Sequence, residues 1–138
     1  MKRYLRALPI FCILIGTLFL LTACASLGPL PEGFSEEDVT AIAVDTVTKL
    51  SSEKYDEVCE RFSPVMNIGA DQLKNAVGAR IEKVGPLEEV LSTTVGGSSH
   101  KDIGDYAVVI LDCRHTDGRS YFTVSIDRDG RICGLYMK

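Results

Sequence analysis

Two histidines and the polar residues near them are the side chains of this 138-residue chain best suited to acid–base or nucleophilic chemistry. His115 ends a run of alternating apolar residues that also holds Asp112 and Cys113, and His100 follows Gly-Gly-Ser-Ser. Histidine titrates near neutral pH and can accept a proton from a hydroxyl or a thiol. Alternation along a strand places Asp112 on the opposite face from His115. Because no Gly-x-Ser-x-Gly motif is present either, we assign no catalytic residue.

The five cysteines lack the close spacing of a zinc or dithiol site. Cys12 and Cys24 belong to an apolar leader and its end, so Cys59, Cys113 and Cys133 remain. The strand pairing described below places a whole strand between Cys113 and Cys133, beyond the about 7 Å Cα separation that a disulfide spans. We expect small buried apolar residues, no metal and no cofactor, and a link from Cys59 to either of the others stays open.

Two Asp-Gly pairs predict the turns of a three-stranded antiparallel meander over residues 104–138. Asp-Gly readily adopts the positive φ angles of a two-residue hairpin turn. The second pair lies within Asp127-x-Asp129-Gly130, which is similar to the start of a calcium loop. The chain lacks the remaining ligands of an EF-hand, so a turn is expected there.

These turns predict a register in which Thr116 pairs with Arg119 and Arg128 pairs with Arg131. The first hairpin then pairs Cys113 with Phe122, Leu111 with Val124, and Val109 with Ile126. The second pairs Ile126 with Cys133, Val124 with Leu135, and Phe122 with Met137. All of these apolar side chains fall on one face of the sheet, because side chains alternate between faces.

The two faces suggest two different binding surfaces. The apolar face predicts a pocket lining, or equally a simple core, made of Val109, Leu111, Phe122, Val124 and Leu135. The other face is mixed and predicts a weak homodimer through Val108, Ile110, Ile132 and Tyr136. We expect Ile110 and Tyr136 near the centre of that dimer.

Helical patterns precede the meander. Ser35 is expected to cap a helix that reaches Leu50, and a shorter helix covers residues 55–62. A third covers residues 73–84 and is closed by Gly85-Pro86. Residues 87–95 read as a strand, and 96–99 as a flexible Gly-Gly-Ser-Ser loop. The predicted domain, residues 35–138, is α+β, with three N-terminal helices packed on a four-stranded antiparallel sheet.

The first 23 residues have the pattern of an export signal. Lys2, Arg3 and Arg6 precede an apolar run of residues 8–21, which is too short for a comfortable membrane span of roughly 20 residues. The run ends in Leu-Thr-Ala-Cys, which resembles the lipobox of bacterial lipoproteins. The resemblance implies cleavage between Ala23 and Cys24, acyl chains on Cys24, and residues 24–34 as a short tether.

Charge argues against some partners. The chain carries −4, and its leader holds three cations and no anion, so the mature part would carry −7. An acidic surface does not neutralise phosphates, so nucleic acid is not an expected partner. It also adds no attraction to anionic lipid, and the acyl chains would anchor the protein alone.

Short segments between residues 37 and 137 resemble the family called domain of unknown function 3887. The matching segments are Ala43-Val44, Lys54-Tyr55-Asp56, Phe62-Ser63, Leu73, Gly85, Val108-Val109 to Cys113, Asp127 to Ile132, and Gly134-Leu135. The resemblance implies a cystatin-like, nuclear-transport-factor-2-like roll in an extracytoplasmic setting. It implies no reaction.

Three functions remain open from sequence. The first is a non-catalytic, lipid-anchored binding or interaction domain at the outer face of the cell membrane, for a protein or a small apolar ligand. The second is a small enzyme of the roll superfamily, such as an isomerase, a dehydratase or a hydrolase-associated protein. The third is a homodimerising structural subunit.

Overall fold

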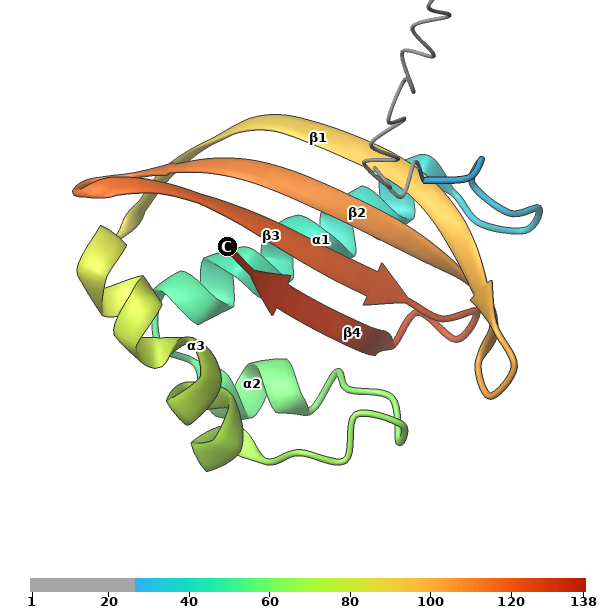
Figure 1. The fold of residues 1–138 in the computed structure, drawn as a ribbon, viewed down its shortest axis with the longest axis horizontal. Helices are drawn as coiled ribbons and strands as arrows, with labels where there is room; N and C mark the ends of the chain where they lie inside the picture. The colour runs from blue at the N-terminus through green and yellow to red at the C-terminus, as the bar shows by residue number, and fades with distance from the viewer. Residues whose placement is uncertain (1–26) are drawn as a thin grey trace, which may run out of the picture.

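A computed structural model describes residues 27–138, and the leader, Ala23 and Cys24 lie outside the described residues. The order is α1 (Glu36–Ser51), α2 (Tyr55–Cys59), α3 (Ala70–Val84), β1 (Leu87–His100), β2 (Gly104–His115), β3 (Gly118–Ile126) and β4 (Ile132–Met137). The strands form one antiparallel sheet in the order β1-β2-β3-β4 (Figure 1). The chain is therefore an α+β protein with a four-stranded antiparallel sheet. Within residues 27–138, no helix combines the length and the apolar character that crossing a membrane requires.

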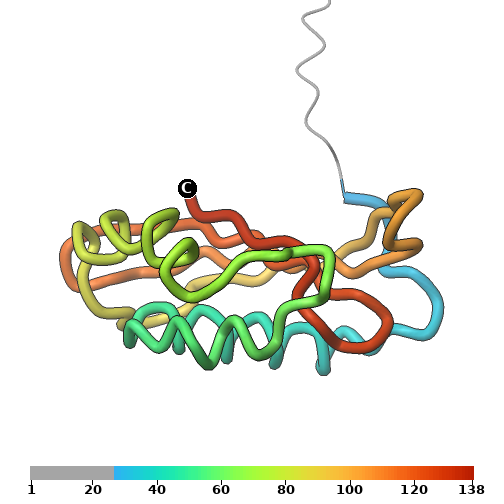
Figure 2. Tube along the Cα trace, turned by 90° about the horizontal axis from the view of Figure 1, so that it is seen from below, coloured from blue at the N-terminus to red at the C-terminus, as the bar shows by residue number. Residues whose placement is uncertain are grey.

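The helices take two different positions against the sheet. α1 lies across one face of it, whereas α2 and α3 lie beside the β4 edge (Figures 1 and 2). The expected cap of α1 is confirmed, because the Ser35 hydroxyl accepts a hydrogen bond from the amide of Asp38 at 3.2 Å. The main core joins the buried face of α1 to the inner face of the sheet and to α3. Its members include Val39, Ala43, Val47, Leu50, Leu73, Val77, Ile81, Val109, Leu111, Phe122, Val124 and Ile126.

The first hairpin is shifted by two residues from its predicted register. His115 pairs with Gly118 and Leu111 pairs with Phe122, so Thr116 and Asp117 form the turn. The amides of these two residues donate to backbone carbonyls at the end of α3 and just after it, at 2.8 and 3.0 Å. Gly118 does not have positive φ. Contacts from outside the hairpin therefore select the turn, in preference to the local Asp-Gly signal.

The second hairpin is correctly predicted except at its turn. Val124 pairs with Leu135 and Phe122 with Met137, as expected. The predicted pair of Ile126 with Cys133 is wrong, because a register irregularity places Ile132 opposite Ile126. Such a bulge moves the side chains beyond it to the other face. Ile132 is 0% exposed and lies in the core, which corrects its expected place on the outer face.

The Gly-Gly-Ser-Ser run is part of β1 rather than a loop. Gly28 and Gly97 exchange backbone hydrogen bonds at 3.0 and 3.2 Å, so the segment before α1 pairs with the free edge of β1. At the opposite edge of the sheet, a short segment likewise forms backbone hydrogen bonds with β4. The amide of Ser63 donates to the Ile132 carbonyl, and the amide of Ile132 donates to the Arg61 carbonyl, both at 2.8 Å. One short segment therefore meets each edge of the sheet.

Candidate functional site

His115 lies in a buried hydrogen-bonded link between β2, β3 and the end of α3. Its Nε2 lies 2.7 Å from the Ser120 hydroxyl oxygen, and its Nδ1 lies 2.9 Å from the Gly85 carbonyl oxygen. The carbonyl can only accept, so Nδ1 carries a proton in this contact. His115 is 3% exposed and Ser120 is 1% exposed. Both polar side chains are thus satisfied inside the protein.

A serine hydroxyl beside a histidine that is oriented by a third group is the arrangement of an activated nucleophile. Here the third group is a backbone carbonyl and the hydroxyl is sealed from solvent. The link joins three elements, and the geometry therefore fits a structural role. Sequence reasoning missed Ser120, although alternation along β3 places it on the same face as Phe122.

The other candidate acid–base groups do not converge on His115. Asp112 lies on the outer face, where Arg119 Nε donates to its Oδ1 at 2.7 Å and Nη2 donates to Oδ2. This hydrogen-bonded guanidinium holds the pKa of the Asp112 carboxyl below its usual range. His100 lies at the end of β1, with Nδ1 3.8 Å from an oxygen of Asp102, and both side chains are exposed. The structure does not bring the predicted candidates together.

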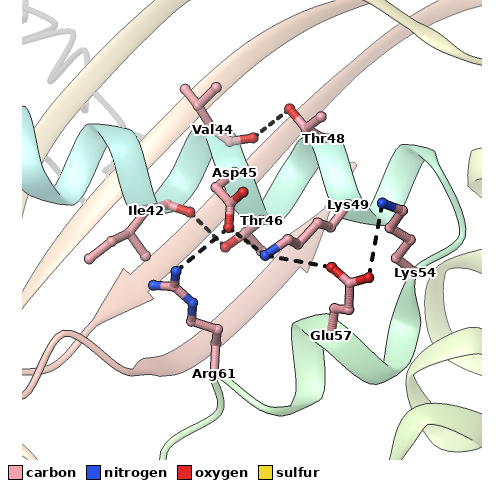
Figure 3. Close-up of polar contacts among 9 residues, drawn as sticks. All are labelled: Ile42, Val44, Asp45, Thr46, Thr48, Lys49, Lys54, Glu57 and Arg61. Carbon is pink, nitrogen blue, oxygen red and sulfur yellow. Dashed lines mark hydrogen bonds and ion pairs between the residues drawn. The ribbon is translucent and has the colours of Figure 1, made fainter.

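A set of charged side chains links α1 to α2 (Figure 3). Lys49 Nζ lies 2.9 Å from Asp45 and 3.8 Å from Glu57, while Lys54 approaches Glu57 at 3.9 Å and Arg61 approaches Asp45 at 3.9 Å. These charges alternate in sign and largely face solvent. Such pairs contribute about 0–1 kcal/mol each, and we assign them to helix packing rather than to chemistry.

The Asp127–Gly130 segment forms a turn, as expected. Asp127 Oδ1 accepts hydrogen bonds from the amides of Asp129 and Arg131, each at 2.9 Å, and Gly130 has φ +75°. The carboxylate therefore organises its own loop. Among residues 27–138, no group of three or more His, Cys, Asp or Glu side chains is placed to hold a metal ion.

The predicted pocket lining belongs to the core. Val109, Leu111, Phe122 and Val124 are fully buried, and Leu135 packs against the same cluster. None of the five lines any of the best-formed surface hollows of residues 27–138. A hollow of about 510 Å³ lies instead where α1 begins, opposite the β3–β4 loop. We call it the α1 hollow, lined by Gly33, Phe34, Ser35, Asp38, Val39, Ala41, Ile42, Ile126, Asp127, Arg128, Asp129 and Gly130.

The α1 hollow has a size typical of small-molecule sites. Phe34 and Ile42 supply apolar surface, and Asp38 and Asp129 supply carboxylates. The hollow also contains Arg128, whose guanidinium lies over the Phe34 ring and is already paired with Asp105. The start of a helix ordinarily favours anions, but the first turn of α1 already carries three acidic side chains. The arrangement therefore suits an apolar group that carries a positive charge.

The outer face is a mixed surface. Tyr136 is 59% exposed and Tyr121 is 43% exposed, whereas Ile110 is half-buried and Val108 is buried. Of the four residues expected at a dimer contact, Ile110 and Tyr136 are the accessible ones. Ile132 is excluded because it faces the core.

Cys59, Cys113 and Cys133 are free thiols in the structure. Burial, with a smaller effect of Asp112, raises the pKa of Cys113 to about 11. Burial, with a smaller effect of Asp127, raises the pKa of Cys133 to about 11. Because the thiolate is the reactive form, these two thiols are poorly suited to nucleophilic or redox chemistry at neutral pH.

No protein-family model matches this chain, and no curated protein matches it. The chain is similar to a solved structure described as the NMR structure of a protein from Ruminococcus gnavus ATCC 29149. The two share 25% sequence identity and superpose with a TM-score of 0.70, over 80% of this chain and 97% of that chain. The similarity shows a shared α+β fold.

Proposed function

We propose that this chain is a lipid-anchored, extracytoplasmic lipoprotein whose domain binds a ligand or partner and catalyses no reaction. The observation that carries the anchor is the order of a basic segment, an apolar run and Leu-Thr-Ala-Cys, which ends only three residues before Leu27. Leu27 is the first described residue of the folded domain. An acyl chain on Cys24 would therefore be attached directly to this domain.

The proposal extends to the fold family. α1 crosses one face of an antiparallel meander, and this arrangement supports a cystatin-like, nuclear-transport-factor-2-like roll. Several segments that resemble domain of unknown function 3887 have structural roles here. Gly85 closes α3 with φ +76°, and the Asp127–Gly130 segment makes the β3–β4 turn.

A binding role is supported by what the polar side chains already contact. His115 bonds to Gly85 and Ser120, Asp112 is held by Arg119, and Asp127 is held by its own loop. The α1 hollow combines apolar side chains with carboxylates on an acidic protein. Its chemistry fits the apolar, cationic side chains of a peptide segment.

The anchor is tested by Cys24→Ser in the full chain, with Cys12→Ser as the matched control inside the leader. We expect Cys24→Ser to abolish labelling by radioactive palmitate and to remove the processed protein from membranes. Cys12→Ser should be labelled and retained normally. Palmitate labelling and membrane retention of Cys24→Ser would contradict the proposal.

The hollow is tested with a phenylalanyl-arginine amide as the probe. We expect amide chemical shifts to change at Phe34, Asp38 and Ile42, and Ile42→Gln to weaken binding at least tenfold. Ala76→Gln, an exposed change on α3 that does not line the α1 hollow, should bind like the wild type. Shift changes confined to other surfaces would contradict this site.

An enzyme is the second candidate, and the 2.7 Å contact between His115 and Ser120 is the observation that favours it. A fluorophosphonate probe would modify Ser120 if the hydroxyl acted as a nucleophile. We expect no modification, because Ser120 is 1% exposed. Stoichiometric labelling of Ser120 in the folded protein would establish the enzyme instead.

A homodimer is the third candidate, favoured by the exposed Tyr136 beside the half-buried Ile110. Sedimentation of the soluble fragment 25–138 across a concentration series tests it. We expect weak association that Ile110→Asp removes without unfolding the monomer. A strictly monomeric wild type at high concentration would eliminate the dimer.

A further inference from the structure

Residues 27–34, which precede the capping Ser35 of α1, are docked on the domain. Gly28 pairs with Gly97 on the free edge of β1. A Cβ atom added to Gly97 would lie 2.3 Å from Pro31 Cδ, and one added to Gly96 would lie 2.6 Å from Leu27 Cβ. Real Cβ atoms essentially never approach other atoms so closely. The two glycines of β1 therefore provide the space in which this segment lies.

Arg128, on the β3–β4 loop, holds the same segment from the other side. Its Nη1 donates to the Glu32 carbonyl oxygen at 3.0 Å, and its guanidinium lies 5.3 Å from the centre of the Phe34 ring. Its Nη2 donates to Asp105 Oδ2 at 3.0 Å, at the start of β2. One side chain thus connects the segment before α1 to two elements of the sheet. We call residues 27–34, docked in this way, the docked segment.

We propose that the docked segment fixes which end of the domain faces the lipid bilayer, and this inference rests on the proposed anchor at Cys24. The membrane-facing end contains the β1–β2 turn and the β3–β4 loop. The β2–β3 turn and the end of α3 face away from the membrane. The docked segment and the β1–β2 turn lie at the same end of the molecule in both views (Figures 1 and 2).

The orientation depends on how far the chain can extend between Cys24 and the domain. An extended chain spans at most about 3.6 Å per residue, so the three steps from Cys24 to Leu27 span no more than about 11 Å. If residues 27–34 were free, the ten steps from Cys24 to Phe34 would reach about 36 Å. β2 has 12 residues and separates the two ends of the sheet by about 40 Å. Docking therefore keeps one end close to the bilayer and the other end far from it.

The surface charge does not account for this orientation. The membrane-facing end carries Asp102, Asp105, Asp127 and Asp129 beside Lys101, Arg128 and Arg131. A mixed, acidic end gains little from anionic lipid. The orientation follows from the short covalent connection, and it places the α1 hollow, at the start of α1 and the β3–β4 loop, on the side of the bilayer.

The test uses the full lipidated chain in phosphatidylcholine vesicles that contain a headgroup-labelled quencher lipid. A thiol-reactive fluorophore is placed at Lys101→Cys or at Asp117→Cys, two exposed positions in turns at opposite ends of the sheet. The chain without an introduced cysteine gives the background from the native thiols. Palmitate labelling and vesicle flotation are measured on every sample.

We expect quenching at position 101 to exceed quenching at position 117 at least threefold. An eight-residue Gly-Ser spacer inserted between Ser26 and Leu27 should bring the two values within a factor of 1.5. Gly97→Ala should have the same effect by displacing the docked segment. Gly69→Ala should keep the wild-type ratio, because a Cβ atom there meets nothing within 4 Å.

The outcomes separate the two proposals. Loss of labelling and flotation in the wild type would overturn the anchor itself. Normal labelling and flotation with equal quenching at the two positions would overturn the orientation alone. A threefold ratio that survives the spacer would also overturn it, since the orientation would then have a cause other than the short connection. The spacer leaves the described residues unchanged, so the test does not depend on how Gly97→Ala folds.

Discussion

The two ends of the sheet each hold a neighbouring segment, but by different physical means. At the end that contains the β2–β3 turn and the end of α3, His115 is 3% exposed and connects Gly85 to Ser120 inside the core. At the end that contains the β1–β2 turn and the β3–β4 loop, Arg128 holds the docked segment with a side chain that is 53% exposed. Buried polar groups are costly to leave unpaired, whereas exposed ones regain water when a contact breaks. The contacts of His115 should therefore persist in the folded protein. The contacts of Arg128 with the docked segment can break at a lower free-energy cost.

The largest expected loss of stability follows substitution of His115. His115→Ala removes a buried ring and leaves the Ser120 hydroxyl without its partner, so it should lower the free energy of unfolding by about 3 kcal/mol. His100→Ala changes an exposed histidine and should cost less than about 0.5 kcal/mol. Urea unfolding with an unchanged m-value measures both variants. Equal losses would remove the distinction between the two ends.

Alkaline pH should destabilise the fold around His115 and Ser120, because Cys113 is the cross-strand partner of Ser120. Burial raises the pKa of Cys113 to about 11, whereas an unfolded thiol titrates near about 8.5. The folded state therefore binds this proton more tightly, and its contribution is complete below about pH 8.5 and lost as pH rises through about 11. The loss should be about 3 kcal/mol, because each pKa unit between about 8.5 and about 11 corresponds to about 1.36 kcal/mol.

Cys113→Ala isolates this effect from the other groups that titrate at high pH. Its free energy of unfolding should fall less steeply than that of the wild type between about pH 9 and pH 11. Urea unfolding at a series of pH values gives the two slopes. Identical slopes would show that Cys113 does not titrate with the predicted coupling.

A moderate effect is expected in the β3–β4 loop, at the same end of the sheet as Arg128. Asp127→Ala removes the acceptor of two backbone hydrogen bonds and should cost about 1 kcal/mol. Asp117→Ala is the matched change in the β2–β3 turn. The contacts of that turn with α3 are made by its backbone amides, so this variant should lose less than about 0.5 kcal/mol. The reverse order would mean that we have misassigned what holds each turn.

The smallest effect on stability is expected from Arg128→Ala, at about 0.5–1 kcal/mol. Its local effect should be larger, with amide hydrogen exchange at Gly28 and Phe34 accelerated at least tenfold while exchange at Leu111 is unchanged. Arg131→Ala removes a neighbouring arginine whose side chain makes no hydrogen bond or ion pair within residues 27–138. Exchange in that control should match the wild type. Unchanged exchange in Arg128→Ala would show that the docked segment is held by other contacts.

The face of each strand was easier to predict than its pairing partner. The first hairpin is displaced by two residues, an even number, so Val109 and Leu111 stay on the core face although their partners changed. The irregularity in the second hairpin involves one residue, an odd number, and it turned Ile132 from the outer face to the core. Alternation alone cannot locate such a bulge.

Glycine was harder to interpret. Gly96-Gly97 has the composition of a flexible loop, yet in the structure both residues lie in β1 and accommodate another segment of the chain. The sequence shows that these residues have no side chain, but it does not show which other segment packs in the space that a side chain would fill. The α1 hollow was missed for a similar reason, since it joins residues 33–42 to residues 126–130 and no local pattern connects them.

The two short segments that meet the edges of the sheet also bear on aggregation. An open edge presents unpaired amides and carbonyls, to which a second chain can add a strand. Gly28 occupies such positions on β1, and Arg61 and Ser63 occupy them on β4. With the anchor proposed above, neighbouring copies would meet at high local concentration, where edge-to-edge addition would be most damaging. Release of residues 27–34 would therefore do more than lengthen a connection, because it would also uncover a β-strand template facing its neighbours.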